Sequence, residues 1–190
     1  MISKEDIKHL EKIFPFWLDI NQNDRAKIIL SSRILSLKKN AIFFNSHDLD
    51  GLLFLKSGKL RFFLSHLEAR ELPLYYLNNM EVEFFEDFSD NSTSTILDIA
   101  FIVEKNSEIL LIPYSVLNLF RDKYSVMEKF LHNLTREKFS KSLLSLQNIL
   151  LIPLKDRLLK FLYSLNRAEI LLTHEEIAKN LGTSREVISR

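Results

Sequence analysis

The chain has 190 residues, of which 46% are hydrophobic and 27% charged, enough for one large or two small domains with a real core. It contains no cysteine, which excludes disulfides, thiolate zinc sites, cysteine-ligated iron–sulfur clusters and thiol redox sensing. The net charge of +1 is unevenly spread: residues 1–120 carry 13 Lys/Arg against 17 Asp/Glu, and residues 121–190 carry 13 against 8. A positive C-terminal third suits a polyanionic partner, although ordinary variation between domains explains it about as well.

No apolar run approaches the ~20 residues that span a bilayer. The first eight residues mix charges early and contain no apolar signal core. We therefore expect a cytoplasmic protein without a membrane partner.

The N-terminal part begins with two predicted helices, at residues 4–16 and 24–32. The period then changes to short apolar or alternating runs rich in Phe and Tyr, with turn signals at Asp50-Gly51 and Ser57-Gly58. Many short strands at this spacing predict an antiparallel sandwich or barrel. The predicted strands are 41–44, 52–55, 60–64, 72–77, 96–103 and 109–112.

After Pro113 the chain turns helical, with a short helix at 115–120 and one helix of about seven turns at 125–150. The long helix has an apolar stripe that slips at Arg136-Glu-Lys138, so it is not an ideal coiled coil. We expect the stripe to pair with a second copy of the chain; burial against the chain's own sandwich is the alternative. The stripe residues are Met127, Phe130, Leu134, Phe139, Leu143, Leu146 and Leu150.

Pro153 breaks the long helix and is a candidate hinge. A helix at 155–165 follows, then a link at 166–172 whose last four residues are compatible with a strand.

The chain closes with two short helices around a tight turn. A Thr-x-x-Glu capping box at Thr173 starts the first helix, and Gly182 ends it because the turn needs left-handed backbone. A second capping box is predicted at residues 183–186. The expected buried positions are Ile177, Ala178, Leu181, Val187 and Ile188.

Such a helix-turn-helix places the start of its second helix in the major groove of double-stranded DNA. Arg185 can donate two hydrogen bonds to a guanine, and Glu186 can accept one from a cytosine. Each has a structural alternative, Glu186 as half of the capping box and Arg185 as a solvated side chain. The expected DNA contacts are Thr173, Ser184, Arg185, Glu186, Ser189 and Arg190.

The sequences LTHEEIA at 172–178, LGTSREVISR at 181–190 and DRLLKFL at 156–162 resemble the Crp/Fnr superfamily of bacterial transcription regulators. LFLKSGKL at 53–60 is similar to the strand–Gly–strand element of that family's sensor domain. The resemblance spans nearly the whole chain and is specific at the C-terminus and loose in the middle.

The resemblance implies an α+β fold: an N-terminal cyclic-nucleotide-binding-like β-roll (a jelly roll), a long dimerisation helix and a C-terminal winged helix-turn-helix. It divides the chain into a sensor with its N-terminal helices at 1–114, a linker with the long helix at 115–152 and a DNA-binding domain at 153–190. It also implies a homodimer, RNA polymerase as a partner, and a signal in the roll that shifts the long helices and resets the recognition helices through the Pro153 hinge.

The family's recognition pattern Glu-x-x-Ser-Arg is present as Glu186, Ser189 and Arg190, which implies a TTGA-N6-TCAA-like operator. Arg185 is similar to an arginine of the cyclic-AMP-responsive branch, so a TGTGA-like half-site is the alternative. The chain stops at Arg190, within the recognition helix, so we expect the wing to be absent from this sequence.

The cyclic-nucleotide pocket of the family is not recognisable. Residues 82–104 contain no Lys or Arg, so an anionic phosphate would be repelled there, and we expect no cyclic AMP binding. The acids of this stretch are Glu83, Glu86, Asp87, Asp90, Asp98 and Glu104.

The sequence therefore does not identify the signal that the β-roll senses. A Phe-rich roll can hold haem or another flat apolar ligand, and some cysteine-free relatives with this recognition helix (the Dnr/NssR-like branch) answer nitric oxide or nitrosative stress. A sensor that binds nothing is the alternative. The axial-ligand candidates, none with a telling spacing, are His9, His47, His66 and His132, with Met80 and Met127 as weaker options.

Two other functional classes compete. An enzyme is disfavoured because the chain has only three glycines, no phosphate loop, no nucleophile elbow and no metal-spaced cluster; a cupin-type metal at His47 and His66 lacks the usual His-x-His pairing. A dimeric interaction module that does not read DNA is the stronger rival.

Overall fold

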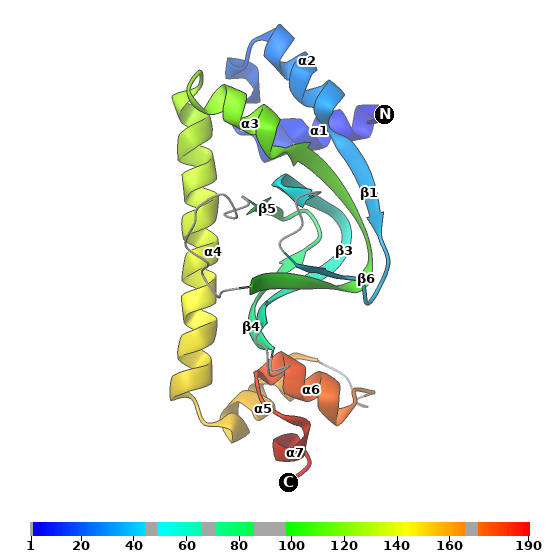
Figure 1. Ribbon diagram of the computed structural model, residues 1–190, viewed down its shortest axis with the longest axis vertical. Helices are drawn as coiled ribbons and strands as arrows, with labels where there is room; N and C mark the ends of the chain where they lie inside the picture. Colours follow the sequence, from blue (N-terminus) through cyan, green and yellow to red (C-terminus); the bar gives the residue numbers. More distant parts are fainter. Residues whose placement is uncertain (1, 45–48, 66–70, 86–97, 166–170) are drawn as a thin grey trace.

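The computed structural model describes residues 2–44, 49–65, 71–85, 98–165 and 171–190. A rolled antiparallel sheet forms the middle of the molecule, a group of helices covers one of its ends, and one long helix runs along its side (Figure 1). The C-terminal helices lie at the opposite end from the N-terminus (Figure 1). This is the predicted α+β architecture of a β-roll with a long helix and a helical C-terminal part.

The N-terminal helices and the helix after the sheet form the cap. The first helix begins with a capping box, in which the Ser3 hydroxyl accepts from the Asp6 N–H and the Asp6 carboxylate accepts from the Ser3 N–H. It ends at Ile13, before the predicted residue 16, because Phe14 is extended ahead of Pro15. The cap consists of α1 (Lys4–Ile13), the 3-10 helix η1 (Trp17–Asp19), α2 (Gln22–Ser31) and α3 (Tyr114–Arg121).

Among the described residues the sheet has six strands, all antiparallel to their neighbours, in the order β1-β6-β3-β4, with β2 paired to β6 and β5 paired to β3. The two long strands β3 and β6 form its centre. The strands are β1 (Arg33–Leu37), β2 (Ile42–Phe44), β3 (Gly51–Ser65), β4 (Leu72–Asn78), β5 (Val82–Phe85) and β6 (Asp98–Pro113).

Four of the predicted strands are wrong as separate elements. The strands 52–55 and 60–64 merge into β3, and 109–112 merges into β6 with the described part of 96–103, which begins at residue 98. The predicted turn at Ser57-Gly58 is an irregular stretch inside β3, where the pairing register with β6 shifts. Gly58 has φ +109, and a Cβ there would lie 2.1 Å from Oγ of Ser107. The glycine therefore permits a close approach of two strands rather than a reversal of the chain.

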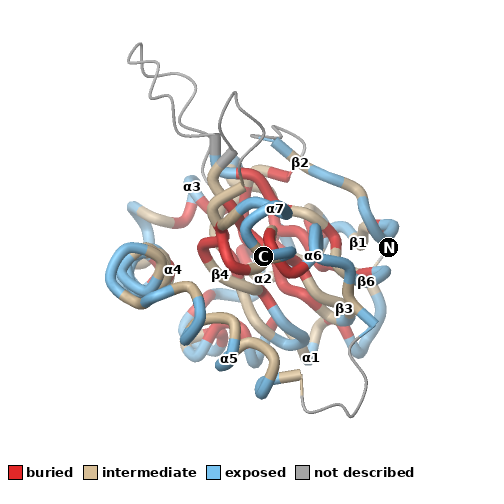
Figure 2. The backbone as a smooth tube through the Cα atoms, turned by 90° about the horizontal axis from the view of Figure 1, so that it is seen from below, coloured by how far each residue is buried: buried red, intermediate tan, exposed pale blue. Residues whose placement is uncertain are grey.

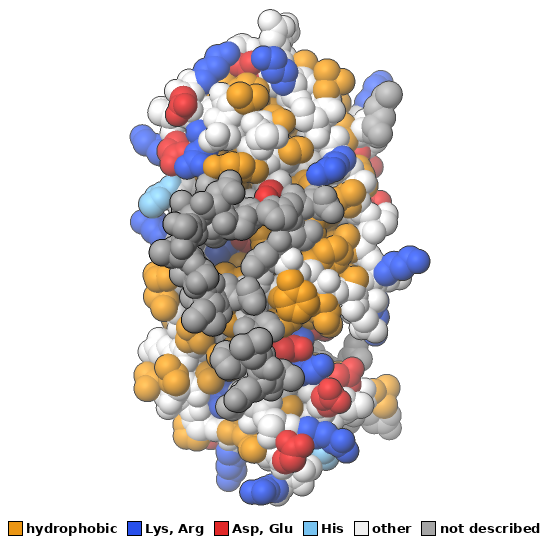
Figure 3. All heavy atoms as spheres, viewed as in Figure 1, with side chains coloured by type: hydrophobic (Ala, Val, Ile, Leu, Met, Phe, Trp, Pro, Cys, Tyr) orange, Lys and Arg blue, Asp and Glu red, His pale blue; other side chains and the backbone are white. Residues whose placement is uncertain are grey.

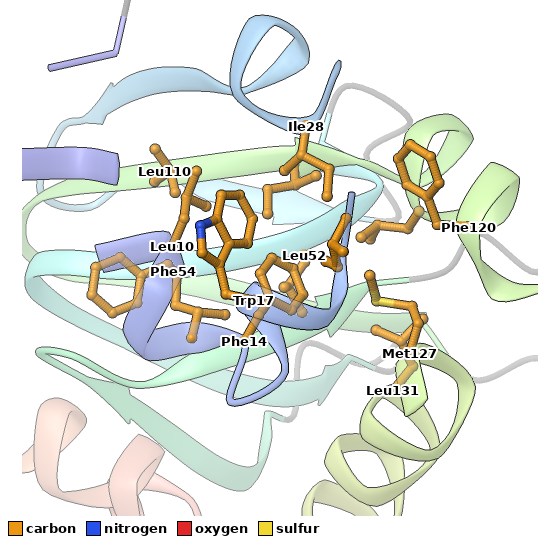
Figure 4. Close-up of a cluster of buried hydrophobic side chains, with 14 residues drawn as sticks. Leu10, Phe14, Trp17, Ile28, Leu52, Phe54, Leu110, Phe120, Met127 and Leu131 are labelled. Atoms are coloured by element: carbon orange, nitrogen blue, oxygen red, sulfur yellow. The ribbon is translucent and has the colours of Figure 1, made fainter. Parts of the chain in front are cut away.

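Alternate residues of β3 enter two different cores. Leu52 and Phe54 face the helical cap and pack with helix residues such as Phe14 and Trp17 (Figure 4). Leu53 and Leu55 face the inside of the roll, which also holds the ring pairs of Phe62 with Phe101 and Tyr75. Figure 2 shows buried segments in the middle of the molecule and exposed segments, such as the outer side of α4, around them. The period-two alternation thus lets one strand hold both the cap and the roll.

The C-terminal half is helical, as predicted. Helix α4 (Ser125–Leu151) ends just before Pro153, which lies at the N-cap of α5 (Leu154–Ser164). Helices α6 (His174–Leu181) and α7 (Arg185–Ile188) follow. Of the link at 166–172, residues 171 and 172 are not in a strand, and the remainder lies outside the described residues. Among the described helices, none is both long and apolar enough to cross a membrane.

Candidate DNA-binding surface and its supporting contacts

The first helix of the helix-turn-helix forms as the sequence predicts. Glu176 N–H donates to Oγ1 of Thr173 at 3.1 Å, and Thr173 N–H donates to Oε2 of Glu176 at 2.8 Å, which completes the capping box. These hydrogen bonds lower the pKa of Glu176 and keep it ionised beside the positive helix end. Gly182 then adopts φ 63 and ψ 41, the left-handed conformation that closes the turn. Ile177, Ala178 and Leu181 are all buried, as expected.

The second helix starts one residue later than expected. Its N-cap is Ser184, without a side-chain capping bond to the helix backbone, so the predicted capping box at 183–186 is wrong. Glu186 instead accepts hydrogen bonds from its own N–H and from the Ser184 hydroxyl, which lower its pKa. The predicted burial of Val187 is also wrong, since its side chain is 46% exposed. A helix of a single turn buries one side only, and Ile188 is the half-buried residue.

All six predicted DNA contacts are exposed. Arg185, Glu186, Ser189 and Arg190 lie on or directly after α7, and Ser184 lies at its start. Thr173 lies at the start of α6 instead, with its hydroxyl already committed to the capping box. The Ser189 hydroxyl donates to the carbonyl of Glu186 at 3.0 Å. Figure 3 shows basic side chains, with acidic ones among them, at this end of the molecule.

Arg157 connects the segment between α4 and α5 to the helix-turn-helix. Its Nε donates to the carbonyl of Ile152 at 3.1 Å, and its Nη1 donates to the carbonyl of Leu181 at the end of α6. The residue after α4 and the last turn of α6 are therefore held by one guanidinium. Arg157 belongs to the DRLLKFL stretch, but nothing in the sequence pattern of that stretch predicted these two hydrogen bonds.

The long helix α4 divides its predicted stripe between two environments. Met127 is fully buried in the cap core, so its prediction as a dimer contact is corrected: it packs within its own chain. Phe130 and Leu134 are partly buried against the same core, and Phe130 contacts the rings of Phe14 and Phe16. The alternative of burial against the chain's own sandwich thus holds for the first part of the stripe.

The second part of the stripe, from Phe139 to Leu150, does not pack against the cap core among the described residues. Phe139 is 61% exposed, Leu143 49% and Leu150 79%, and Leu146 is half-buried. The neighbouring Leu144 and Leu151 are exposed as well. An apolar surface of this kind on a soluble helix indicates an interaction site.

Lys138 explains why the stripe slips in the middle of α4. Its side chain points into the molecule, 3.5 Å from Oε2 of Glu83 on β5, and its ammonium lies 5.3 Å from the centre of the Tyr75 ring. Oε1 of Glu83 accepts from the N–H of Phe84 at 3.2 Å, and Oε2 has no hydrogen-bond partner among the described residues. Burial raises the pKa of Glu83 to about 7, although Lys138 and Tyr75 lower it. The sequence did not predict this pair. The interruption of the apolar stripe at residues 136–138 was the only feature of the sequence that pointed to it.

Two of the acids of residues 82–104, Glu83 and Glu104, therefore do have basic neighbours, supplied by other elements. Besides the Glu83 pair, Glu104 accepts from Nε of Arg61 on β3 at 2.8 Å. Both cations are already occupied by these acids. The described part of this stretch thus offers an anionic phosphate no uncommitted cation.

The haem-ligand candidates that the structure describes do not gather in one place. His47 and His66 lie outside the described residues. His9 packs on the Phe54 ring at 5.1 Å with its Nδ1 buried and unpartnered, and His132 is exposed on α4. Met80 is exposed in the turn before β5, where its φ is 67, and Met127 is a core residue. Within the described ranges, no group of His, Cys, Asp and Glu is suited to a metal ion.

The fold has close counterparts of known structure. A transcriptional regulator of the Crp/Fnr family from Eubacterium rectale aligns with 95% of this chain and 85% of its own, at 28% identity and a TM-score of 0.79. The c-di-GMP-responsive global regulator CLP of Xanthomonas campestris aligns over 90% and 89% at 17% identity, with a TM-score of 0.63. FixK2 of Bradyrhizobium japonicum aligns over 84% and 81% at 14% identity, with a TM-score of 0.63.

No protein-family model matches the chain, and neither does any curated protein sequence. The last two structures share the fold alone, whereas the first combines the fold with sequence similarity over almost the whole chain. The first of these proteins is described as a transcriptional regulator and the second as a global regulator. With its β-roll, long helix and helix-turn-helix, the chain is similar in both fold and sequence to a transcription regulator of the Crp/Fnr family.

Proposed function

We propose that the protein is a sequence-specific DNA-binding regulator that acts as a homodimer on a near-palindromic operator. The observation that carries this proposal is the helix-turn-helix: its first helix is capped and buried on one side, while all six candidate DNA contacts are exposed. A dimer of such units presents two recognition helices to successive major grooves.

Glu186, Ser189 and Arg190 are proposed to read a TTGA half-site, in a TTGA-N6-TCAA-like operator. Glu186 has an exposed, ionised carboxylate that can accept from a cytosine amino group, and Arg190 can donate two hydrogen bonds to a guanine. Thr173 and Ser184 lie at helix N-termini and are assigned to phosphates. The exposed Arg185 supports a TGTGA-like half-site as the alternative.

The exposed part of the α4 stripe is the proposed dimer interface, formed by Phe139, Leu143, Leu146 and Leu150. Residues 1–114, 115–152 and 153–190 are the proposed sensor, linker and DNA-binding segments, with Pro153 as the hinge. RNA polymerase is the proposed further partner, and the cytoplasm the proposed location.

The signal is proposed to be something other than a cyclic nucleotide, because Arg61 and Lys138 are already paired with acids. Nitric oxide, bound directly or through a haem, is the proposed class of signal, as in the Dnr/NssR-like branch. A signal in the roll then shifts the α4 helices and, through Pro153, the setting of the recognition helices.

The test is binding to labelled duplexes that carry a TTGA or a TGTGA half-site, measured by fluorescence anisotropy at several salt concentrations. The proposal predicts tightest binding to the TTGA palindrome and a steep loss of affinity with salt. Glu186→Ala and Arg190→Ala are each expected to cost about 1–3 kcal/mol and to relax base preference. Glu11→Ala, at an exposed residue of α1, is the control.

Equal, salt-independent binding to all duplexes would instead support an interaction module that does not read DNA. If Glu186→Ala lowered thermal stability and left base preference unchanged, its role would be structural alone.

A further inference from the structure

The sensor sheet makes a direct contact with the helix-turn-helix, independent of the chain connection through α4 and α5. The Tyr76 hydroxyl on the edge strand β4 donates to Oδ1 of Asn180 on α6. Asn180 in turn donates to the carbonyl of Glu176 at 2.7 Å, which fixes its amide group. Burial raises the pKa of Tyr76 to about 12, so its hydroxyl keeps the proton that it donates.

An ionic contact lies beside this hydrogen bond. Glu71, the residue before β4, accepts from Nη2 of Arg61 at 2.8 Å and lies 3.7 Å from Nζ of Lys179 on α6. Arg61 is only 2% exposed and is also held by Glu104. Glu71 is therefore fixed by a buried guanidinium on the sensor side and presents its other oxygen to the helix-turn-helix.

The turn of the helix-turn-helix packs against the beginning of the same strand. A Cβ on Gly182 would lie 3.1 Å from Cδ of Pro73 on β4 and 3.1 Å from Cδ1 of Ile149 on α4. The Pro73 carbonyl accepts from the Ser145 hydroxyl of α4 at 2.6 Å. The start of β4 therefore touches the long helix and the DNA-binding turn at the same point.

These contacts use the side of the helix-turn-helix that the DNA contacts do not. Thr173, Ser184, Arg185, Glu186, Ser189 and Arg190 all remain exposed while α6 is docked on β4. Docking therefore fixes the direction in which α7 points without covering it.

We propose that Tyr76 and Glu71 of the sensor, paired with Asn180 and Lys179 of α6, form an interdomain latch that holds the helix-turn-helix in a setting ready to bind DNA. Through the latch, β4 contacts the helix-turn-helix directly. The sensor thus affects the setting of the recognition helix by this contact as well as through the proposed Pro153 hinge. Its value for operator binding rests on the proposed function, whereas its role in holding the two parts together does not.

The latch can be tested by distance measurement in the whole chain. Because the chain has no cysteine, spin labels attach only at introduced positions, here Ser36→Cys on β1 and His174→Cys on α6. Double electron–electron resonance is recorded with labelled protein diluted in unlabelled protein, so that only distances within one chain are observed. The latch variant is Tyr76→Phe with Glu71→Gln, which keeps an acceptor for Arg61 while removing the hydroxyl and the charge.

The matched control is Tyr163→Phe with Glu11→Gln, at two exposed residues outside the contact. We expect one narrow distance distribution for the parent and control proteins and a broadened or shifted one for the latch variant, with circular dichroism melting verifying that all are folded. A broad distribution in the parent, or identical distributions in parent and latch variant, would overturn the latch whether or not the protein binds DNA.

Operator affinity tests the second half of the proposal. A freed helix-turn-helix occupies the binding-ready setting only part of the time, which weakens the apparent affinity by that fraction. We expect an affinity loss of roughly 3- to 10-fold for the latch variant and none for the control. An affinity gain would show that the latch restrains binding, and would overturn this part of the proposal. If parent and control bind no operator while the distances change as expected, the proposed function fails and the latch stands.

Discussion

Lys138 of α4 and Glu83 of β5 form an ion pair in which both residues are less than a tenth exposed, at 7% and 3%, with Nζ and Oε2 3.5 Å apart. The pair ties the middle of the long helix to the β-sheet. Each charge has lost most of its hydration, so each depends on the other and on Tyr75. The apolar pattern of α4 slips at the turn where this lysine enters.

Removing Lys138 alone should be costly. Lys138→Met leaves a buried carboxylate without its cation, and we expect a loss of about 3–5 kcal/mol in the free energy of unfolding at pH 8. Glu83→Gln combined with Lys138→Met should recover much of it, because no charge is then buried. Urea unfolding measures both, with Lys129→Met at an exposed position of α4 as the control. Additive losses in the double variant would show that the two residues are not coupled.

The same pair should make stability depend on pH. The pKa of Glu83 rises from 4.5 in the unfolded chain to about 7 in the fold. The stability that this group contributes is fully present below pH 4.5 and is lost as pH rises through 7, by about 3 kcal/mol in total. Asp6 and Asp24 have lowered pKa values and act in the opposite direction, below pH 3.8.

Urea unfolding of the parent and of Glu83→Gln between pH 4.5 and 8 isolates this contribution from that of the histidines. The stability of the parent relative to the variant should decrease as pH rises. A constant difference across this range would contradict the raised pKa.

Gly182→Ala should destabilise the DNA-binding end. The positive φ of 63 costs an L-residue about 1 kcal/mol, and the new Cβ would displace Pro73 or Ile149. We expect a total loss of about 1–2 kcal/mol in unfolding free energy. Thr183→Ala, at the next residue, is the control, and thermal unfolding is the measurement. An unchanged melting temperature for Gly182→Ala would mean that the turn relaxes freely away from β4.

Two capping boxes of the same design allow a structural role to be separated from a DNA-binding role. Ser3→Ala on α1 and Thr173→Ala on α6 each remove a hydroxyl that accepts from a backbone N–H, and each should lose about 1 kcal/mol of stability. Only Thr173→Ala is expected to weaken operator binding, because α6 is proposed to contact DNA phosphates and α1 is not. Equal operator affinity of the two variants would leave Thr173 with the capping role alone.

The exposed half of the α4 stripe should control association. Leu143→Glu places a charge in the proposed dimer interface, and sedimentation equilibrium should show a shift from dimer to monomer. Leu18→Glu, at a leucine that is 84% exposed on η1, should leave the association state unchanged. A parent protein that sediments as a monomer, or a Leu143→Glu variant that remains dimeric, would contradict the assigned interface.

The sequence by itself determined the local elements whose signals are contained within a few residues. The capping box at Thr173, the left-handed Gly182, the buried face of α6 and the long helix ending before Pro153 are all confirmed. Each rests on hydrogen bonding or backbone geometry between near neighbours, which composition and spacing encode directly.

Tertiary structure decided how those elements meet. Merging four predicted strands into β3 and β6 required a long-range register shift at Gly58, and burying Met127 required the helical cap. Helix α7 begins after an N-cap at Ser184 that no motif specified, and Val187 is exposed.

The Glu83–Lys138 pair and the contact of Tyr76 with Asn180 join residues far apart in the sequence. Their energies depend on burial and on a partner from another element, and neither quantity is present in a local pattern. The helix-turn-helix could therefore be predicted from the sequence, whereas its contact with the β-sheet could be found only from the tertiary structure.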